Sequence, residues 1–295
     1  MPNPASPDQA DRQTTGLLER AAPLARALSD LLCHTPNGRD HCGALHGIWS
    51  DLRLLGMAAE PARHARFYAD ALGARVVKNA GRVLISGCAD WGMLETVVLA
   101  YQRHHADLDV TVVDRCATPT LLCAWYGAHM GLPVRTAVAD VGQYADHQPF
   151  DVICTHSLLT YPALDGRRQL VANWYRLLQP GGAVVTVTRL SSETVSPDGN
   201  EDRAQRFGEL VAQRCAERGL VRDLGELRRR AARFAMAQVS HAVGNEADVR
   251  ELFEQAGFDV TRLDVVQLDG VISTREPVGG AARGGVYAEI VAVRR

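Results

Sequence analysis

Lysine is almost absent from this chain of 295 residues, because Lys78 is the single lysine among its 32 basic residues. P-loop nucleotide hydrolases and protein kinases both need a lysine at a fixed place in a motif. Lys78 lies in neither motif. These two classes of enzyme are therefore excluded.

An excess of charge of either sign is also missing, since 34 acidic residues offset the 32 basic ones and give a formal net charge of −2. The chain has no net basic field that would hold a nucleic-acid backbone or an anionic membrane surface. We therefore expect no nucleic acid and no membrane as partners, and a small molecule as the substrate. No feature of the sequence indicates an oligomeric state.

Long apolar runs are missing as well, since none approaches the ~18 residues that cross a bilayer. Residues 1–13 lack the basic and then apolar order of a secretory signal. The seven cysteines are scattered and mostly lie in apolar runs, which is typical of thiols in a reducing compartment. We therefore expect a cytoplasmic protein.

The pattern of apolar residues divides the chain into segments of different character. Helical spacing dominates first, then short β-branched runs alternate with helical patterns, and an arginine-rich helical stretch interrupts that alternation. The predicted segments are a disordered tail (1–13), a helical N-terminal lid and substrate segment (14–78), an α/β core (79–190), a helical insertion (191–243), and a final segment that completes the core with one helix and strands 6 and 7 (244–295).

The alternation of strands and helices predicts an α/β fold with a doubly wound, mostly parallel sheet of seven strands. The closing run 286–293 is a strand without a crossover helix before it, so this last strand is predicted to pair antiparallel. The helix that carries Trp174 is expected to end at Pro180-Gly181-Gly182, and the fifth strand is expected to begin at Ala183.

Five motifs over about 81–295 occur in an order that resembles the class I S-adenosylmethionine-dependent methyltransferases, whose sheet is Rossmann-like. They are the glycine loop Ser86-Gly87-Cys88-Ala89-Asp90-Trp91-Gly92, Asp114 at the end of the second strand, Asp140 in Ala137-Val138-Ala139-Asp140-Val141, the strand Phe150-Asp151-Val152-Ile153-Cys154, and the turn Leu177-Leu178-Gln179-Pro180-Gly181-Gly182. The last of these is the most specific single signature.

The resemblance implies that segment 79–190 binds S-adenosylmethionine. In this family the glycine loop meets the methionine carboxylate, the acid at the position of Asp114 accepts both ribose hydroxyls, and the acid at the position of Asp140 meets the adenine amino group. The implied cofactor-binding residues are Ser86, Gly87, Cys88, Ala89, Asp90, Asp114, Arg115, Asp140, Val141 and Thr155.

The glycine loop departs from the pattern of the family. An acidic residue is expected where Ile85 stands, and glycines are expected where Ala89 and Trp91 stand, so Asp90 is the nearest candidate for the amino group of the cofactor. The same loop can be read as a degenerate dinucleotide fingerprint of a nicotinamide enzyme. The Pro-Gly-Gly turn, Asp140 and the unaccompanied last strand favour the methyltransferase, and no Tyr-x-x-x-Lys motif is present.

Four residues are candidates for contact with the substrate or for catalysis. His156 follows the fourth strand, where ligands of open α/β sheets gather, and could act as a general base or line the pocket. Tyr161, a few residues further on, is a candidate to line the pocket. Trp49 and Tyr68 are candidates for an aromatic lid, because aromatic rings attract a sulfonium through cation–π contacts, although aromatic residues at helical spacing are more often core.

Cysteine and histidine are densest at Cys33-His34, His41-Cys42 and His46. Zinc accepts these side chains, but two adjacent pairs separated by six residues match no common zinc-finger or ribbon spacing. We therefore expect no metal site.

The resemblance predicts an S-adenosylmethionine-dependent methyltransferase of the secondary-metabolite type, with in-line methyl transfer to a small molecule. One alternative is attack at the methionine side chain with release of methylthioadenosine, as in aminocarboxypropyl transferases and azetidine-2-carboxylate synthases. A second alternative is a non-catalytic scaffold that binds S-adenosylmethionine. The residues Thr155-His156-Ser157-Leu158 replace the Asn/Asp-Pro-Pro-Tyr element of DNA amino methyltransferases, which favours a small metabolite over a nucleobase.

Overall fold

The structure is a computed structural model that describes residues 7–33, 41–78, 80–196, 200–268 and 285–295. These residues form two compact units. We call them the helical unit, from the described parts of Met1–Ala59 and Val195–Val239, and the sheet unit, from the described parts of Glu60–Thr194, Ser240–Leu268 and Gly285–Arg295.

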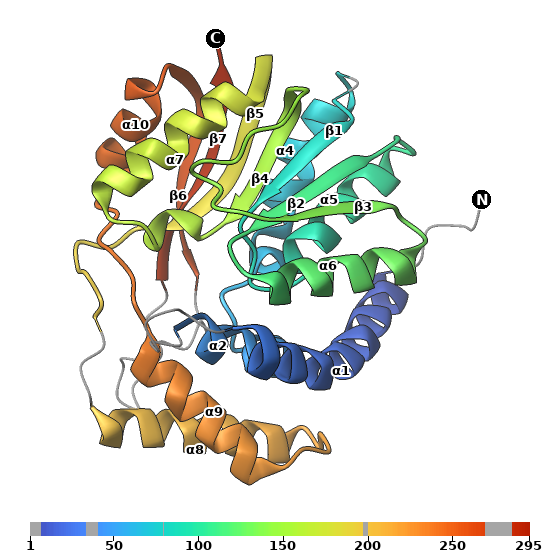
Figure 1. The fold of residues 1–295 in the computed structure, drawn as a ribbon, viewed down its shortest axis with the longest axis vertical. Helices are drawn as coiled ribbons and strands as arrows, with labels where there is room; N and C mark the ends of the chain where they lie inside the picture. Colours follow the sequence, from blue (N-terminus) through green and yellow to red (C-terminus); the bar gives the residue numbers. More distant parts are fainter. Residues whose placement is uncertain (1–6, 34–40, 79, 197–199, 269–284) are drawn as a thin grey trace. The chain divides into compact units, whose positions relative to one another are not determined.

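The sheet unit is built on seven strands in the order β3-β2-β1-β4-β5-β7-β6 (Figure 1). Their bounds are Arg82–Ser86 (β1), Asp109–Asp114 (β2), Val134–Val138 (β3), Phe150–His156 (β4), Leu178–Arg189 (β5), Phe258–Leu268 (β6) and Gly285–Arg294 (β7). Strands β1 to β5 pair in parallel, whereas β7 lies antiparallel to both β5 and β6. The predicted sheet, with its antiparallel last strand, is confirmed, and this arrangement is that of the class I methyltransferase fold.

Helices cover both faces of the sheet, as its apolar strands require. The helices of this unit are η1 (Pro61–His64), α4 (Ala65–Val76), α5 (Gly92–Arg103), α6 (Ala117–Met130), η2 (Leu158–Thr160), α7 (Leu164–Leu177) and α10 (Glu246–Gln255). On one face, Trp174 of α7 and Phe253 of α10 are fully buried in one core cluster with strand residues such as Ile153. Helix α4 packs against α5, and α5 contacts β4.

The Pro-Gly-Gly turn lies inside β5, and this differs from the sequence prediction. Helix α7 ends at Leu177, and β5 begins at once, because Leu178 pairs with Phe150. The next paired residue along β5 is Ala183, opposite Val152, so the residues between Leu178 and Ala183 form a bulge. Gly181 makes that bulge possible, since its φ of +78° is one that residues with a side chain rarely adopt.

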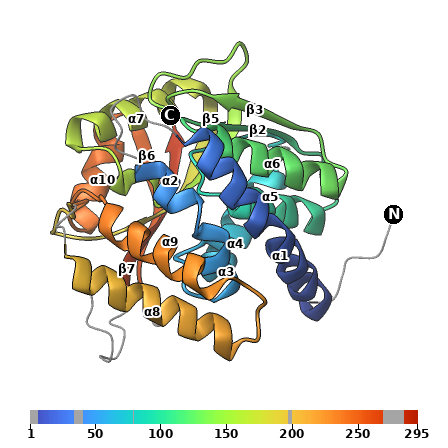
Figure 2. The ribbon, with the colours of Figure 1, turned by 60° about the horizontal axis from the view of Figure 1, so that its bottom comes forward.

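Two segments that are distant in the sequence form the helical unit. Its helices are α1 (Pro7–Leu32), α2 (His41–His46), α3 (Trp49–Leu54), α8 (Glu201–Glu217) and α9 (Leu224–Ala237), and Figure 2 shows α9 beside α2. They share an apolar core in which Ile48 and Leu52 meet Phe207 and Phe234. No helix in the described part of the chain has both the length and the apolar composition to cross a membrane.

Two boundaries differ from the predicted segments. Helix α1 begins at Pro7, inside the predicted tail 1–13, and proline suits the first turn of a helix because its missing N–H has no partner there in any case. Helix α4, which the sequence analysis grouped with the lid, packs on the sheet through α5 and β5. Phe67, Ala71 and Leu72 lie on the buried face of α4. The helical spacing of these apolar residues therefore reflects packing within the sheet unit.

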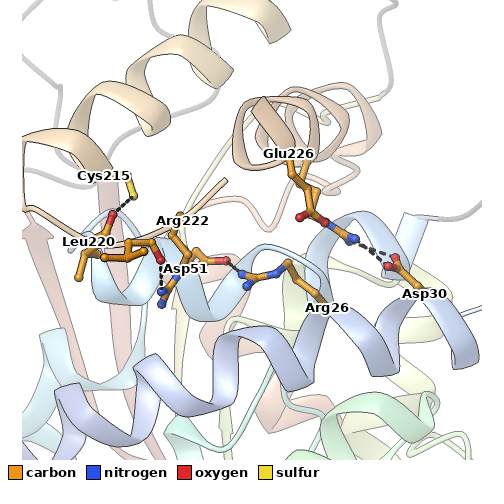
Figure 3. A network of polar contacts seen from close by, with 9 residues as sticks. Arg26, Asp30, Asp51, Cys215, Leu220, Arg222 and Glu226 are labelled. Carbon is orange, nitrogen blue, oxygen red and sulfur yellow. Dashed lines mark hydrogen bonds and ion pairs between the residues drawn. The ribbon is translucent and has the colours of Figure 1, made fainter. Parts of the chain in front are cut away.

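A buried carboxylate joins the two segments of the helical unit. The Asp51 side chain is 4% exposed and lies 2.5 Å from Arg26 Nη1 and 3.0 Å from Arg222 Nε (Figure 3). A second pair, between Asp30 and Arg230, also joins α1 to α9, but the Asp30 side chain is 53% exposed. Removal of one partner from a buried pair is costly because the remaining charge is left without compensation.

We predict that Asp51→Asn lowers the free energy of unfolding of the helical unit by about 3–5 kcal/mol, because two arginines lose their shared anion. The matched control is Asp30→Asn, which removes a largely exposed ion pair and should cost about 0–1 kcal/mol. Urea unfolding followed by far-ultraviolet circular dichroism measures both. Equal losses in the two variants would contradict the role assigned to Asp51.

Candidate functional site

The carboxyl ends of β1 and β2 are joined by the side chain of Asp114, the last residue of β2. Its Oδ2 accepts a hydrogen bond of 2.9 Å from the backbone N–H of Cys88, and its Oδ1 accepts one of 2.8 Å from the N–H of Cys116. Each carboxylate oxygen has a second lone pair. The backbone therefore holds the carboxylate in place at the end of β2.

The turn after β1 requires glycine at position 87. Gly87 has a φ of +70°, and its N–H donates to the Val113 carbonyl at 2.8 Å. A Cβ on this residue would lie 2.8 Å from Cδ1 of Leu158, so the turn and η2 approach each other closely. This approach places the glycine loop and the end of β4 side by side.

The departures of the loop from the family pattern have structural explanations. Trp91, where a glycine was expected, is fully buried and stacks on Tyr126 with ring centroids 4.7 Å apart. Asp90 accepts a 2.8 Å hydrogen bond from the N–H of Gly92 and so caps the start of α5. The hydroxyl of Ser86 accepts from Trp174 Nε1 in the core, and the Ser86 side chain is fully buried.

The two remaining loop residues, Cys88 and Ala89, are partly exposed. The Sγ atom of Cys88 lies 4.0 Å from that of Cys123, and this contact together with burial raises the pKa of the Cys88 thiol well above its usual value. Cys88 is therefore a neutral thiol. It is not suited to nucleophilic catalysis, which needs the thiolate.

Asp140 follows β3 at the same edge of the sheet. It is exposed, and its Oδ1 accepts a 2.8 Å hydrogen bond from the N–H of Gly142. The neighbouring Val141 is buried, and its carbonyl accepts from the side chain of Asn173 at 2.7 Å. Arg115, which follows Asp114, is exposed. The loop after β3 is therefore anchored by Asn173 with its acidic side chain toward solvent.

His156, the last residue of β4, has an imidazole whose tautomer is set by Tyr68. The Tyr68 phenol donates to the Thr155 carbonyl at 2.8 Å and lies 3.1 Å from Nδ1 of His156. Because the phenol has one hydrogen and gives it to that carbonyl, Nδ1–H of the imidazole must donate to the phenol oxygen. In the neutral ring the lone pair is then on Nε2, as a general base requires.

Further residues lie at or near the end of β4. Tyr68 is fully buried, and burial raises the pKa of its phenol well above the usual value, so the phenol stays protonated. The Oγ1 atom of Thr155 is buried and has no hydrogen-bond partner among the described residues. Ser157 adopts a left-handed backbone with φ of 56°, which turns the chain sharply after His156. Tyr161 is 51% exposed at the end of η2.

Trp49 lies in the helical unit on α3, where it is partly buried against the apolar core of that unit. The structure thus brings together Asp114, the glycine loop, Thr155, His156 and Tyr68 in the sheet unit. Trp49 belongs to a different unit, and its predicted role as part of a lid stays a prediction.

A second histidine was missed by the sequence analysis. His64, at the end of η1, has a side chain that is 1% exposed and lies with Nδ1 2.8 Å from Oε1 of Glu289 on β7. Its Nε2 is buried and has no hydrogen-bond partner among the described residues. The His64 ring lies 5.5 Å from the His156 ring and 5.3 Å from the Tyr287 ring. Because His64 and Glu289 are 225 positions apart, no local pattern could have paired them.

Burial lowers the pKa of the His64 imidazole below its ordinary value of 6.5. The hydrogen bond and negative charge of Glu289 act in the opposite direction, and the charge of Arg63 adds to the lowering. The net effect favours a neutral ring at neutral pH. Nδ1–H then donates to the Glu289 carboxylate, and Nε2 carries a lone pair.

We predict that His64 makes the protein less stable in mild acid. Its folded pKa lies below the unfolded value, so the unfolded chain binds more protons and stability falls as the pH drops below about 6.5. His64→Gln should reduce this loss, as measured by urea unfolding midpoints between pH 7 and pH 5. The control, His147→Gln, changes an exposed histidine and should keep the wild-type slope. An unchanged slope in His64→Gln would refute the prediction.

Comparison with known proteins gives likenesses of structure. No protein-family model and no curated protein matches the chain. TehB from Haemophilus influenzae is similar with a TM-score of 0.48 and 11% identity, over 77% of this chain and 62% of TehB. Magnesium protoporphyrin IX methyltransferase (ChlM) from Synechocystis PCC 6803, with bound SAM, has a TM-score of 0.48 and 10% identity, over 84% of this chain and 91% of ChlM.

The N-methyltransferase NodS from Bradyrhizobium japonicum WM9, in complex with S-adenosyl-L-homocysteine, is a third similar structure. Its TM-score is 0.45 and its identity 15%, over 84% of this chain and 97% of NodS. The strand order of the present chain, with β7 antiparallel between β5 and β6, identifies its fold independently of these likenesses. The chain has the class I S-adenosylmethionine-dependent methyltransferase fold.

Proposed function

We propose that this protein is an S-adenosylmethionine-dependent methyltransferase that acts on a small molecule, of the secondary-metabolite type. The observation that carries the proposal is the geometry of Asp114. Both of its carboxylate oxygens are oriented by backbone N–H groups at the edge of the sheet where open α/β folds bind nucleotides. A carboxylate in this position suits a ribose with two adjacent hydroxyls.

The residues around Asp114 fit such a cofactor. Gly87 has no side chain, and the start of α5 offers the positive end of a helix dipole to a carboxylate. Asp140 presents an exposed acid near the end of β3, and Thr155 has a buried hydroxyl without a partner among the described residues. When bound, S-adenosylmethionine would supply a methyl group on a positively charged sulfur.

The protein itself would position the acceptor and accept its proton. His156 suits that role because Tyr68 holds its Nδ1 and directs the lone pair to Nε2. Tyr68 is then a positioning residue, since it acts through the imidazole. The residues at the end of β4 and just after it, His156-Ser157-Leu158, are not those of enzymes that methylate DNA bases, and the net charge of −2 also favours a small acceptor.

We predict that the wild-type chain binds S-adenosylhomocysteine in titration calorimetry and shows no binding of NAD. Asp114→Ala should weaken this binding by roughly 2–4 kcal/mol, because charged hydrogen bonds to the ribose are lost. The matched control is Asp109→Ala, at the opposite end of β2, where the carboxylate is half exposed and pairs with Arg135. Binding of NAD without binding of S-adenosylhomocysteine would overturn the proposal.

The reaction is tested by mass spectrometry of the cofactor product after incubation with S-adenosylmethionine and a low-molecular-mass metabolite extract. We expect S-adenosylhomocysteine. Release of methylthioadenosine would instead show attack at the methionine side chain, and binding with neither product would indicate a scaffold.

We further predict that His156→Gln lowers the rate of S-adenosylhomocysteine formation by about 10²–10⁴-fold, as expected for the loss of a positioned base. The affinity for S-adenosylhomocysteine should stay close to that of the wild type. His147→Gln, an exposed histidine in the loop after β3, is the control and should keep the wild-type rate. A loss of affinity with no change in turnover would show that His156 only lines the cofactor site.

A further inference from the structure

Two cysteines and a histidine of the helical unit lie together, although their spacing in the sequence indicated no metal site. Cys33 follows the end of α1, and Cys42 and His46 lie on α2. The ligand atoms of these three residues are all within 4.8 Å of one another. The spacing of four residues places Cys42 and His46 on one face of their helix. His34 lies outside the described residues, and so does the side chain of His41.

The ends of the two helices are fixed to each other by further contacts. The N–H of Cys33 donates to the Ser29 carbonyl at 3.1 Å and continues the helical pattern of α1. The Ser29 hydroxyl donates to the Gly43 carbonyl in α2 at 2.9 Å. A Cβ on Gly47 would lie 3.1 Å from the same hydroxyl, so α1 and α2 approach closely here. The three ligand side chains are therefore held on a scaffold formed by two helices.

The distances agree with the coordination of zinc. With bonds of about 2.3 Å to sulfur and 2.0–2.1 Å to nitrogen, a tetrahedral zinc ion holds a thiolate and an imidazole about 3.6 Å apart. The Sγ atom of Cys33 lies 3.4 Å from Nδ1 of His46. Two thiolates on one zinc ion are about 3.8 Å apart, and all pairs in this cluster are at most 4.8 Å apart. Small movements of the side chains would bring the ligand atoms to the distances found around a zinc ion.

The surroundings favour zinc over harder metal ions. Cys33 is 1% exposed and His46 is 4% exposed, and the cluster contains no carboxylate among the described residues. Thiolate and imidazole ligands select zinc or copper, whereas magnesium and calcium need oxygen ligands. Thiolates offset the charge of a divalent cation, which suits a buried site.

We propose that Cys33, Cys42 and His46 bind one zinc ion that links the end of α1 to α2. Binding releases the protons of the two thiols and adds the free energy of metal binding to the stability of the helical unit. The site is independent of the proposed methyl transfer, because its test measures metal content and spectra.

The test uses the full chain, expressed in zinc-supplemented medium and purified without a histidine tag. Elemental analysis should find about one zinc per chain, because ligand atoms within 4.8 Å of one another can surround one ion. Replacement of zinc by cobalt should give the near-ultraviolet charge-transfer absorption of thiolate–cobalt bonds and the strong visible bands of a tetrahedral site. Cys42→Ser changes the most exposed of the three residues and should lose most of the metal and reduce the charge-transfer absorption.

The control variant is Cys215→Ser, because Cys215 is also buried in the helical unit but donates to the Leu220 carbonyl at 3.6 Å. It should retain the metal at the wild-type level. Wild-type chain without zinc and without cobalt absorption would overturn the proposal, as would full metal content in Cys42→Ser. A mass 2 Da lower, with a peptide that links Cys33 to Cys42, would show a disulfide and also overturn it.

Discussion

The site depends on the two hydrogen bonds that backbone N–H groups donate to the Asp114 carboxylate. The carboxyl ends of parallel strands leave their loops without the pairing that holds the strands, so something else must fix those loops. Asp114 does so, because one oxygen holds the loop after β1 through Cys88 and the other holds the chain before α6 through Cys116. Two loops from different strands thereby share one anion, and their positions are set together. Gly87 then allows η2 to approach the same point.

The fold could be predicted from the sequence because its signals are local. Strand and helix periods differ, and the antiparallel β7 follows from the missing crossover helix, so neither requires knowledge of distant partners. Asp114 was singled out through the resemblance to the methyltransferase family, as the acid at the end of the second strand. Details that depend on packing were not predicted. The buried stack of Trp91 on Tyr126 and the bulge around Gly181 arise from contacts with other elements.

Pairs of polar residues from distant segments were beyond the sequence analysis for the same reason. His64 and Glu289 are 225 positions apart in the sequence, and Asp51 and Arg222 are 171 positions apart. Each member alone is an unremarkable polar residue on a helix, strand or loop. The pairing follows from the way in which β7 lies beside β5, and from the way in which α8 and α9 return to the helices of the N-terminal segment.

His64 and His156 differ in what they can do, although each has an oxygen partner at Nδ1. His64 is 1% exposed, and burial lowers its pKa, so it is closed to an acceptor and resists protonation. His156 is partly exposed as a residue, although its Nε2 atom is buried, and it is the last residue of a strand at the carboxyl edge of the sheet. A proton taken up by His156 would place a positive charge on a ring that lies 5.5 Å from the ring of His64, the partner of Glu289. Glu289 pairs with the His64 ring, and charges interact more strongly in a buried site than in water. His64, which pairs with Glu289, is therefore a direct neighbour of the imidazole that we propose as the base.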